Sequence, residues 1–165
     1  MSNILKFFLL IFFCCLILFS YLLNLNDNVY KNPKDYSIVH SKIKCPEKIK
    51  HFPNAIPIEA KDIKLYGHTT KNNDERLLLE FSIDKEYIIK ELKNHDFINK
   101  NTKIGETQEI YYMQQIGHDI KNYTFYVIND PENLIYSKSF FPYFSGIGID
   151  LNNSKILYYY ISPSD

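Results

Sequence analysis

Residues 76–95, RLLLEFSIDKEYIIKELKNH, indicate the fold class of the chain. Their first eight residues are rich in apolar side chains, which predicts a central β-strand. Asp84 follows, and its carboxylate is suited to accept hydrogen bonds from the free N–H groups that begin a helix. Beyond it, Ile88 and Leu92 share one face while lysines occupy the other, which is typical of an amphipathic helix. The stretch therefore predicts a buried strand followed by a capped helix over 84–95.

Strand patterns flank this unit on both sides. Residues 63–67 predict a short first strand, and the polar stretch HTTKNNDE at 68–75 predicts the connection to the next strand. Four later stretches are typical of strands joined by hairpin turns, namely 123–129, 134–140, 146–150 and 155–161. Residues 104–118 fit a short helix or a strand, and a strand is favoured. We therefore expect an α+β domain with a mainly antiparallel sheet and one main helix.

The N-terminal part contains a long apolar run. Residues 7–23, FFLLIFFCCLILFSYLL, are 17 residues without a charge. Extended to 4–25, a helix would be about 33 Å long, enough to cross a hydrocarbon core of about 30 Å. A cleaved signal peptide fits less well because the run continues past Ser20, its only small residue near a cleavage position. A lipoprotein signal needs a small residue before its cysteine, whereas Phe13 precedes Cys14. The run therefore predicts an uncleaved transmembrane signal anchor.

The anchor divides the chain into three parts. Residues 1–25 form the anchor, the proline-punctuated stretch 26–56 is expected to be a tether, and 57–165 are expected to form the exported domain. Lys6 favours a cytoplasmic N-terminus under the positive-inside rule. We expect a single-pass membrane protein with an extracytoplasmic C-terminal domain, in a bacterial inner membrane and facing the periplasm.

Lysines are concentrated in the expected tether. Its segment SKIKCPEKIK contains Lys42, Lys44, Lys48 and Lys50. These side chains either lie on anionic lipid or belong to a solvated linker. The linker is favoured, because the whole chain has 18 Lys against a single Arg and is therefore biased towards lysine everywhere.

Composition excludes several classes of protein. The 165 residues include 19 basic and 19 acidic side chains, so the chain lacks the excess positive charge of a nucleic-acid-binding protein. Its 45% hydrophobic content excludes an intrinsically disordered chain. Of the three cysteines, Cys45 is alone in the exported part, so no internal disulfide is expected there. One globular domain without a nucleic-acid partner remains.

Catalytic and metal-binding motifs are not found in the sequence. The five histidines show no metal-ligand spacing, and there is no nucleophile elbow or phosphate loop. We expect no cofactor, no metal and no catalytic residue from local sequence. The alternative is a hydrolase whose site assembles in three dimensions from dispersed residues, with His68, His95, His118, Glu80 and Asp150 as candidates.

Aromatic residues near the C-terminus are the candidate binding residues. The segment FFPYF at 140–144 includes Pro142, which lacks the N–H that a central strand needs and so predicts a bend or an edge. The run YYY at 158–160 places Tyr159 on one face of a strand and its two neighbours on the other. If helices cover only one side of the sheet, one of these faces is open to solvent or a partner. The expected binding residues are Phe140, Phe141, Tyr143, Phe144 and Tyr159.

The function expected from these features is binding. The favoured interpretation is a membrane-anchored module, of an immunity type or an envelope accessory, that recognises a protein partner. The alternatives are the dispersed-site hydrolase, a module that oligomerises through its edge strands, and aromatic rings that simply close the core. No motif of a known family is evident.

Overall fold

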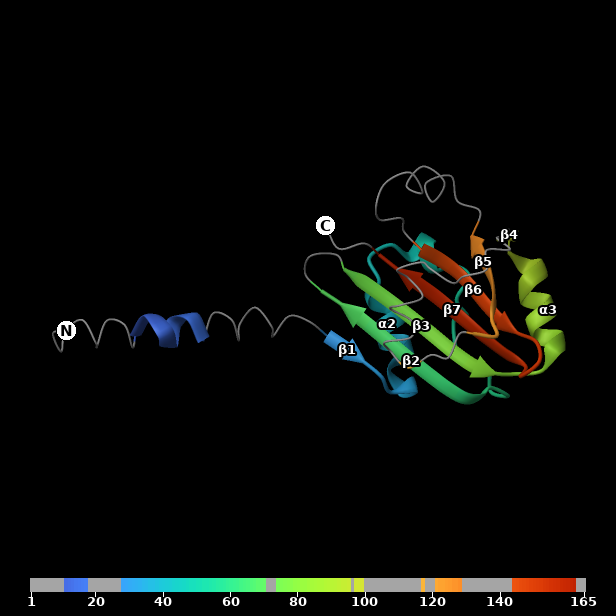
Figure 1. Ribbon diagram of the computed structural model, residues 1–165, viewed down its shortest axis with the longest axis horizontal. Coiled ribbons are helices and arrows are strands. Elements are labelled where there is room, and N and C mark those ends of the chain that lie inside the picture. The colour runs from blue at the N-terminus through green and yellow to red at the C-terminus, as the bar shows by residue number, and fades with distance from the viewer. Residues whose placement is uncertain are drawn as a thin grey trace.

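One antiparallel sheet forms the centre of the molecule (Figure 1). The computed structural model describes residues 11–17, 28–70, 74–95, 97–99, 117, 121–128 and 144–162. Within these residues, seven strands pair in the order β1-β2-β3-β7-β6-β5-β4, and every neighbouring pair is antiparallel. Their bounds are β1 Asn28–Tyr30, β2 Lys61–Thr69, β3 Glu75–Ser82, β4 Phe97–Asn99, β5 Thr124–Ile128, β6 Phe144–Asp150 and β7 Lys155–Ile161.

Helices pack against one face of this sheet, which we call the helix face. They are η1 (Pro33–Asp35), α2 (Tyr36–Lys42), η2 (Pro46–Ile49) and α3 (Lys85–Asn94). Val39 of α2, Ile49 of η2 and Ile88 of α3 are at most 1% exposed and share one hydrophobic core with the sheet. The α+β class and the antiparallel sheet are therefore confirmed.

The predicted strand–helix unit is present. β3 covers the predicted strand except for Ile83, and the Asp84 carboxylate accepts the Tyr87 N–H at 2.7 Å as the N-cap of α3. Ile88 is buried, as the helical spacing predicts, whereas Ile89 is 45% exposed. β6 and β7 form the predicted C-terminal hairpin. The predicted strand at 134–140 and the ambiguous stretch at 104–118 lie outside the described residues, Gly117 excepted.

Two boundaries differ from the expectation. β2 runs from Lys61 to Thr69, so His68 belongs to a strand and not to a loop. The expected tether is also folded, because residues 28–56 contain β1, η1, α2 and η2. Its apolar residues are spaced to face the sheet, and Tyr36, Val39, Ile43, Ile49 and Phe52 are at most 5% exposed. Two of its prolines, Pro33 and Pro46, stand at the first turn of η1 and η2, where a missing N–H costs nothing.

The central strands are buried on both sides. Tyr158 and Tyr160 of β7 lie in the helix-face core, whereas Tyr159 lies in a second cluster on the opposite face with Leu78 and Phe125. The alternation predicted for these three tyrosines is therefore confirmed, and all three are at most 1% exposed.

Two rows of cross-strand partners mark the two ends of the sheet. We call the end that contains β1 the proximal end and the opposite end the distal end. The row at the proximal end is Val29, His68, Arg76, Ile161 and Phe144. The distal row is Lys61, Ser82, Lys155 and Asp150. At the usual rise per residue, the two rows are about 20 Å apart along a strand. β1 belongs to the proximal end and α3 follows the distal end of β3, so the two lie at opposite ends of the sheet (Figure 1).

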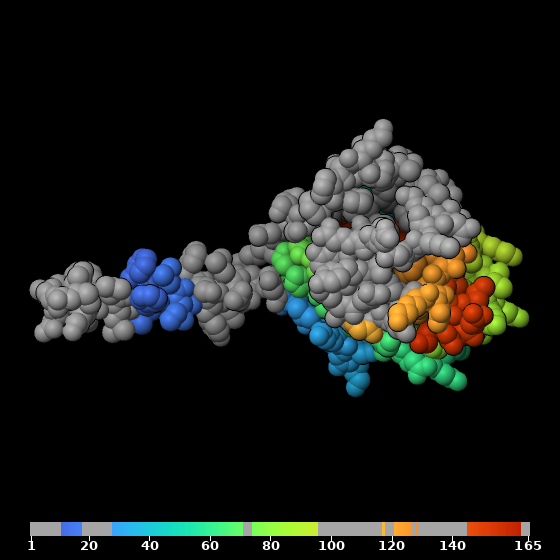
Figure 2. Space-filling view, viewed as in Figure 1, coloured from blue at the N-terminus to red at the C-terminus, as the bar shows by residue number. Residues whose placement is uncertain are grey.

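The helical residues 11–17 lie apart from the sheet domain (Figures 1 and 2). All seven of them are exposed. No helix in the described parts of the chain is both long and apolar enough to cross a membrane. The remainder of the apolar run at 4–25 lies outside those parts.

Candidate functional site

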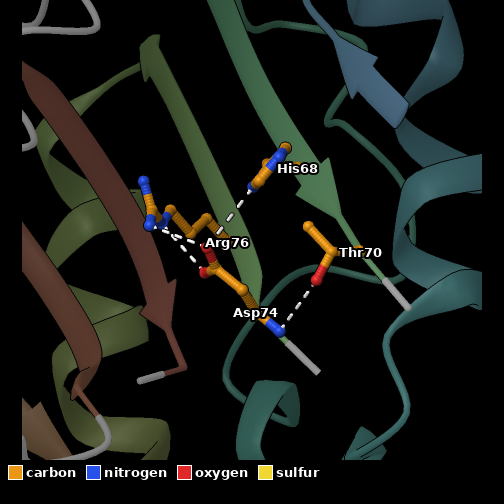
Figure 3. Close-up of polar contacts among 4 residues, drawn as sticks. All are labelled: His68, Thr70, Asp74 and Arg76. Carbon is orange, nitrogen blue, oxygen red and sulfur yellow. Dashed lines mark hydrogen bonds and ion pairs between the residues drawn. The ribbon is translucent and has the colours of Figure 1, made fainter. Parts of the chain in front are cut away.

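A polar cluster lies at the proximal end of the sheet, where β2 and β3 are connected (Figure 3). Arg76 holds the Asp74 carboxylate with two hydrogen bonds, from Nε to Oδ1 at 3.2 Å and from Nη2 to Oδ2 at 2.9 Å. The Thr70 hydroxyl accepts the Asp74 backbone N–H at 3.1 Å, and the Asp74 carbonyl accepts the Thr70 N–H. These contacts close the hairpin and fix the carboxylate beside His68.

The imidazole of His68 is the most unusual group in this cluster. Its Nδ1 is buried and makes no hydrogen bond to any described residue, and the Asp74 Oδ2 atom is 3.9 Å away. That separation exceeds hydrogen-bond distance, and Arg76 already neutralises the carboxylate. The arrangement is therefore a weak carboxylate–imidazole pair, which would become a full ion pair only with His68 protonated. The Thr70 hydroxyl points to the hairpin backbone (Figure 3).

A second polar network joins α3 to β7 on the helix face. The Tyr158 hydroxyl donates to Glu91 Oε2 at 2.9 Å and lies 3.4 Å from the Tyr87 hydroxyl. His95 Nε2 is 3.8 Å from the same Glu91 oxygen. Burial, followed by the hydrogen bond to Tyr87, raises the pKa of Tyr158, so this phenol stays protonated and keeps donating. The network locks α3 against the sheet.

His51 follows η2 in the chain, is buried and carries a strongly shifted pKa. Its Nε2 donates to the Tyr159 carbonyl at 3.3 Å, and the residue is 2% exposed. Burial lowers the pKa of His51 to about 3, a shift that the backbone carbonyls of Tyr159 and Gly146 partly oppose and that the charge of His95 increases. The imidazole is therefore neutral at ordinary pH and packs in the core as an uncharged side chain.

Glu75 joins α2 to the proximal end of the sheet. Its carboxylate oxygens accept the Lys44 backbone N–H at 3.1 and 3.2 Å, and the residue is 2% exposed. Burial raises the pKa of Glu75, while the N–H and the positive charge of Lys44 lower it. The segment after α2 is thereby held next to the β2–β3 hairpin.

The residues considered for a dispersed hydrolytic site have separate partners. His68 lies in the proximal row beside Asp74, whereas Asp150 lies in the distal row and accepts the N–H groups of Asn152 and Asn153 in the β6–β7 turn. Glu80 is bound to Lys64 Nζ at 3.0 Å, and His95 lies beside Glu91. His118 lies outside the described residues. Within those residues, no group of three His, Cys, Asp or Glu side chains is placed to hold a metal ion.

The predicted binding residues lie in two different settings. Phe140, Phe141 and Tyr143 lie outside the described residues, and Phe144 begins β6 in the proximal row. Tyr159 is 0% exposed, so its ring is part of the core rather than of an open surface. We expected one face of the strand at 158–160 to be open to solvent or a partner, and the face that carries Tyr159 is not.

Close packing explains the burial of Tyr159. Its ring meets the Phe125 ring edge to face at 5.7 Å, and its hydroxyl donates to the Tyr126 carbonyl at 3.3 Å. Gly146 lies directly opposite, where a Cβ atom would meet the Tyr159 hydroxyl at 2.5 Å. A glycine on the neighbouring strand thus provides the space for the tyrosine ring.

Several residues of these clusters have no signal in the sequence. His68 and Asp74 are neighbours only because β2 and β3 form a hairpin, and Tyr158 and Glu91 are 67 positions apart. Arg76, as the single arginine of the chain, is the one residue that composition singles out.

No family model, no curated protein and no solved structure matches the chain.

Proposed function

We propose that the protein is a membrane-anchored binding module, with an anchor at 4–25 and an extracytoplasmic α+β domain that recognises a protein partner. The observation that carries the anchor in this proposal is the exposure of the helix at 11–17. Its large apolar side chains are between 44% and 67% exposed, namely Ile11, Phe12, Phe13, Leu16 and Ile17.

The physical reason is the direction of these side chains. Seven helical residues make nearly two turns, so their side chains point to all sides of the helix. Leaving one such side chain in water instead of an apolar environment costs about 1.5–3 kcal/mol. A helix that is apolar all round requires either a protein core or a bilayer. A bilayer supplies that environment for the whole uncharged run at 7–23.

Membrane flotation of the full-length protein tests the anchor. Two arginines in the run, Phe12→Arg with Leu16→Arg, should release the protein from membranes, since each costs about 2.5–3.5 kcal/mol at a helix centre. The matched control is Ile38→Arg with Ile58→Arg, at domain residues that are 47% and 95% exposed. The control should float like the wild type. Flotation of the first variant, or release of the wild type by alkaline carbonate, would contradict the anchor.

The aromatic segment at 140–144, in which Pro142 predicts a bend or an edge, is the binding surface that we propose for the protein partner. Pro142 removes a backbone donor from this segment, and its aromatic side chains supply large contact area at low entropic cost. The last residue of this segment, Phe144, is the first residue of β6. A strand of the sheet next to this segment reduces the conformational entropy that the segment must lose on binding.

Affinity capture from detergent-solubilised membranes tests this surface. The full-length protein should retain a stoichiometric protein that Phe141→Asp with Tyr143→Asp loses, with a nearly unchanged melting temperature. Ile89→Asp is the matched control, because Ile89 is an apolar residue of α3 that is 45% exposed. It should capture the same protein. A melting temperature lowered by many degrees in the double variant would instead assign these rings to the core, and equal capture by all three proteins would exclude the bend.

A further inference from the structure

We infer that the proximal end of the sheet faces the bilayer and that the α2–η2 segment, with Lys42 and Lys44, contacts anionic lipid headgroups. This inference rests on the proposed anchor, and it adds an orientation and a second membrane contact to it. The short chain between the apolar run and β1 limits the distance between the anchor and the sheet. The apolar run ends at Leu25 and β1 begins at Asn28, so these Cα atoms are at most about 11 Å apart.

The register of the sheet extends this restraint to other strands. Asn28 pairs with Thr69, and Thr69 pairs with Glu75. The start of β1, the β2–β3 hairpin and the start of β3 therefore lie side by side. The distal end is about 20 Å further away along the strands. A tether of 31 residues would have left the domain free to turn, whereas this connection holds one end of the sheet near the membrane.

Lysines of the α2–η2 segment lie at this same end. The Lys44 N–H binds the Glu75 carboxylate, and Lys42 Nζ donates to the Tyr30 hydroxyl of β1. Both lysines are exposed, as is Lys50 after η2, and Glu47 is the one exposed acidic residue between Lys42 and Lys50. The exposed charge of this segment is therefore positive, which complements anionic headgroups.

Tryptophan fluorescence tests the orientation, because the chain has no Trp of its own. Ser41→Trp places a reporter beside Lys42, and Asn152→Trp places one in the β6–β7 turn at the distal end, both at exposed positions. The full-length variants are reconstituted in vesicles that contain anionic lipid and a phospholipid with a nitroxide on its headgroup. Ser41→Trp should lose more than half of its fluorescence, and Asn152→Trp should lose almost none. Equal quenching of the two would overturn the orientation.

A second pair of reporters allows proximal and distal quenching to be compared even if one of the first two variants fails to fold. Asn28→Trp in β1 and Lys85→Trp at the start of α3 are also exposed and repeat the proximal and distal positions. Flotation shows whether only the inferred orientation is wrong or whether the proposed anchor is wrong as well. Vesicles that carry the protein but quench neither proximal reporter would overturn this inference alone, whereas a protein that does not float would overturn the anchor and the inference together.

Charge removal tests the lysine contact. A lysine near an anionic surface shifts a docking equilibrium by roughly fivefold, so Lys42→Gln with Lys44→Gln should lower the ratio of docked to undocked Ser41→Trp protein by roughly thirtyfold. Lys85→Gln with Lys90→Gln, at exposed positions of α3, is the matched control and should change nothing. Quenching that is the same in neutral and anionic vesicles would overturn the lipid contact.

Discussion

His51 shows how one buried side chain couples folding to pH. The imidazole is 2% exposed and donates to the Tyr159 carbonyl, and burial lowers its pKa to about 3. The unfolded chain therefore binds a proton at a higher pH than the folded chain does. The contribution of His51 to stability is complete above pH 6.5 and is lost as the pH falls towards 3.

Replacement by glutamine should remove this pH dependence. The His51→Gln side chain keeps an N–H donor in place of Nε2 but does not titrate. Between about pH 7.5 and pH 5, the wild type should lose about 2 kcal/mol of unfolding free energy more than the variant. Urea unfolding of the full-length protein in detergent at both pH values measures the difference. Parallel losses in the two proteins would show that His51 is not buried as a neutral group.

At the scale of elements, the packing of α2 on β2 is what makes residues 28–56 part of the domain. Gly67 of β2 lies under Val39 of α2, and a Cβ atom at Gly67 would come within 2.5 Å of the Val39 Cγ1 atom. Val39 is itself 0% exposed. The absence of a side chain at Gly67 therefore sets how closely α2 approaches the sheet.

A double-mutant cycle measures this contact. Gly67→Ala should lower the unfolding free energy by about 1–3 kcal/mol, since the stiff valine cannot rotate away from the added methyl group. In a Val39→Ala background, the same change should cost little, because the clashing methyl groups are gone. Chemical denaturation of the four proteins gives the coupling energy. Additive effects would mean that α2 does not rest on Gly67, as a loose tether would predict.

The edges of the sheet differ from its centre. β1 and β4 have three residues each, and β2 carries an irregularity between Lys61 and Lys64 with Asp62 at a φ of 50°. Short edge strands, bulges and lysines oppose edge-to-edge pairing. These features weigh against oligomerisation through edge strands as the role of the domain.

At the scale of the whole molecule, the proposed anchor would determine where the domain can act. Lys6 precedes the apolar run, so the N-terminus is expected in the cytoplasm and the domain outside it. A reporter enzyme that is active only outside the cytoplasm should be active when fused after Asp165 and inactive when fused before Met1. Enzyme assays on intact bacterial cells measure both fusions. The reverse pattern would invert the proposed topology.

The inferred orientation would also limit the proposed partner. Phe144, the last residue of the proposed binding segment, lies in the proximal row with Val29. A protein that contacts the bend must therefore approach the bilayer closely if the anchor holds. A membrane protein meets this condition more readily than a freely diffusing one.

The sequence predicts those elements whose signals are local. β3, α3 and the β6–β7 hairpin follow from apolar periodicity, the Asp84 cap and turn residues, all within a few positions of one another. The sequence alone favours a tether at 26–56, because lysines and prolines interrupt its few apolar residues. Only the sheet beneath it shows that Val39 and Ile49 have an apolar surface to bury against.

The chain's own sequence determined the α+β class, the alternation of the three tyrosines and the apolar run at 4–25, since each depends on residue order and on fixed backbone periods. Tertiary structure alone decided that Tyr159 is core, that His68 lies beside Asp74, and that β1 places one end of the sheet next to the apolar run. The physical reason is that burial and ion pairing depend on distances between strands, and strand pairing sets those distances between residues far apart in the chain.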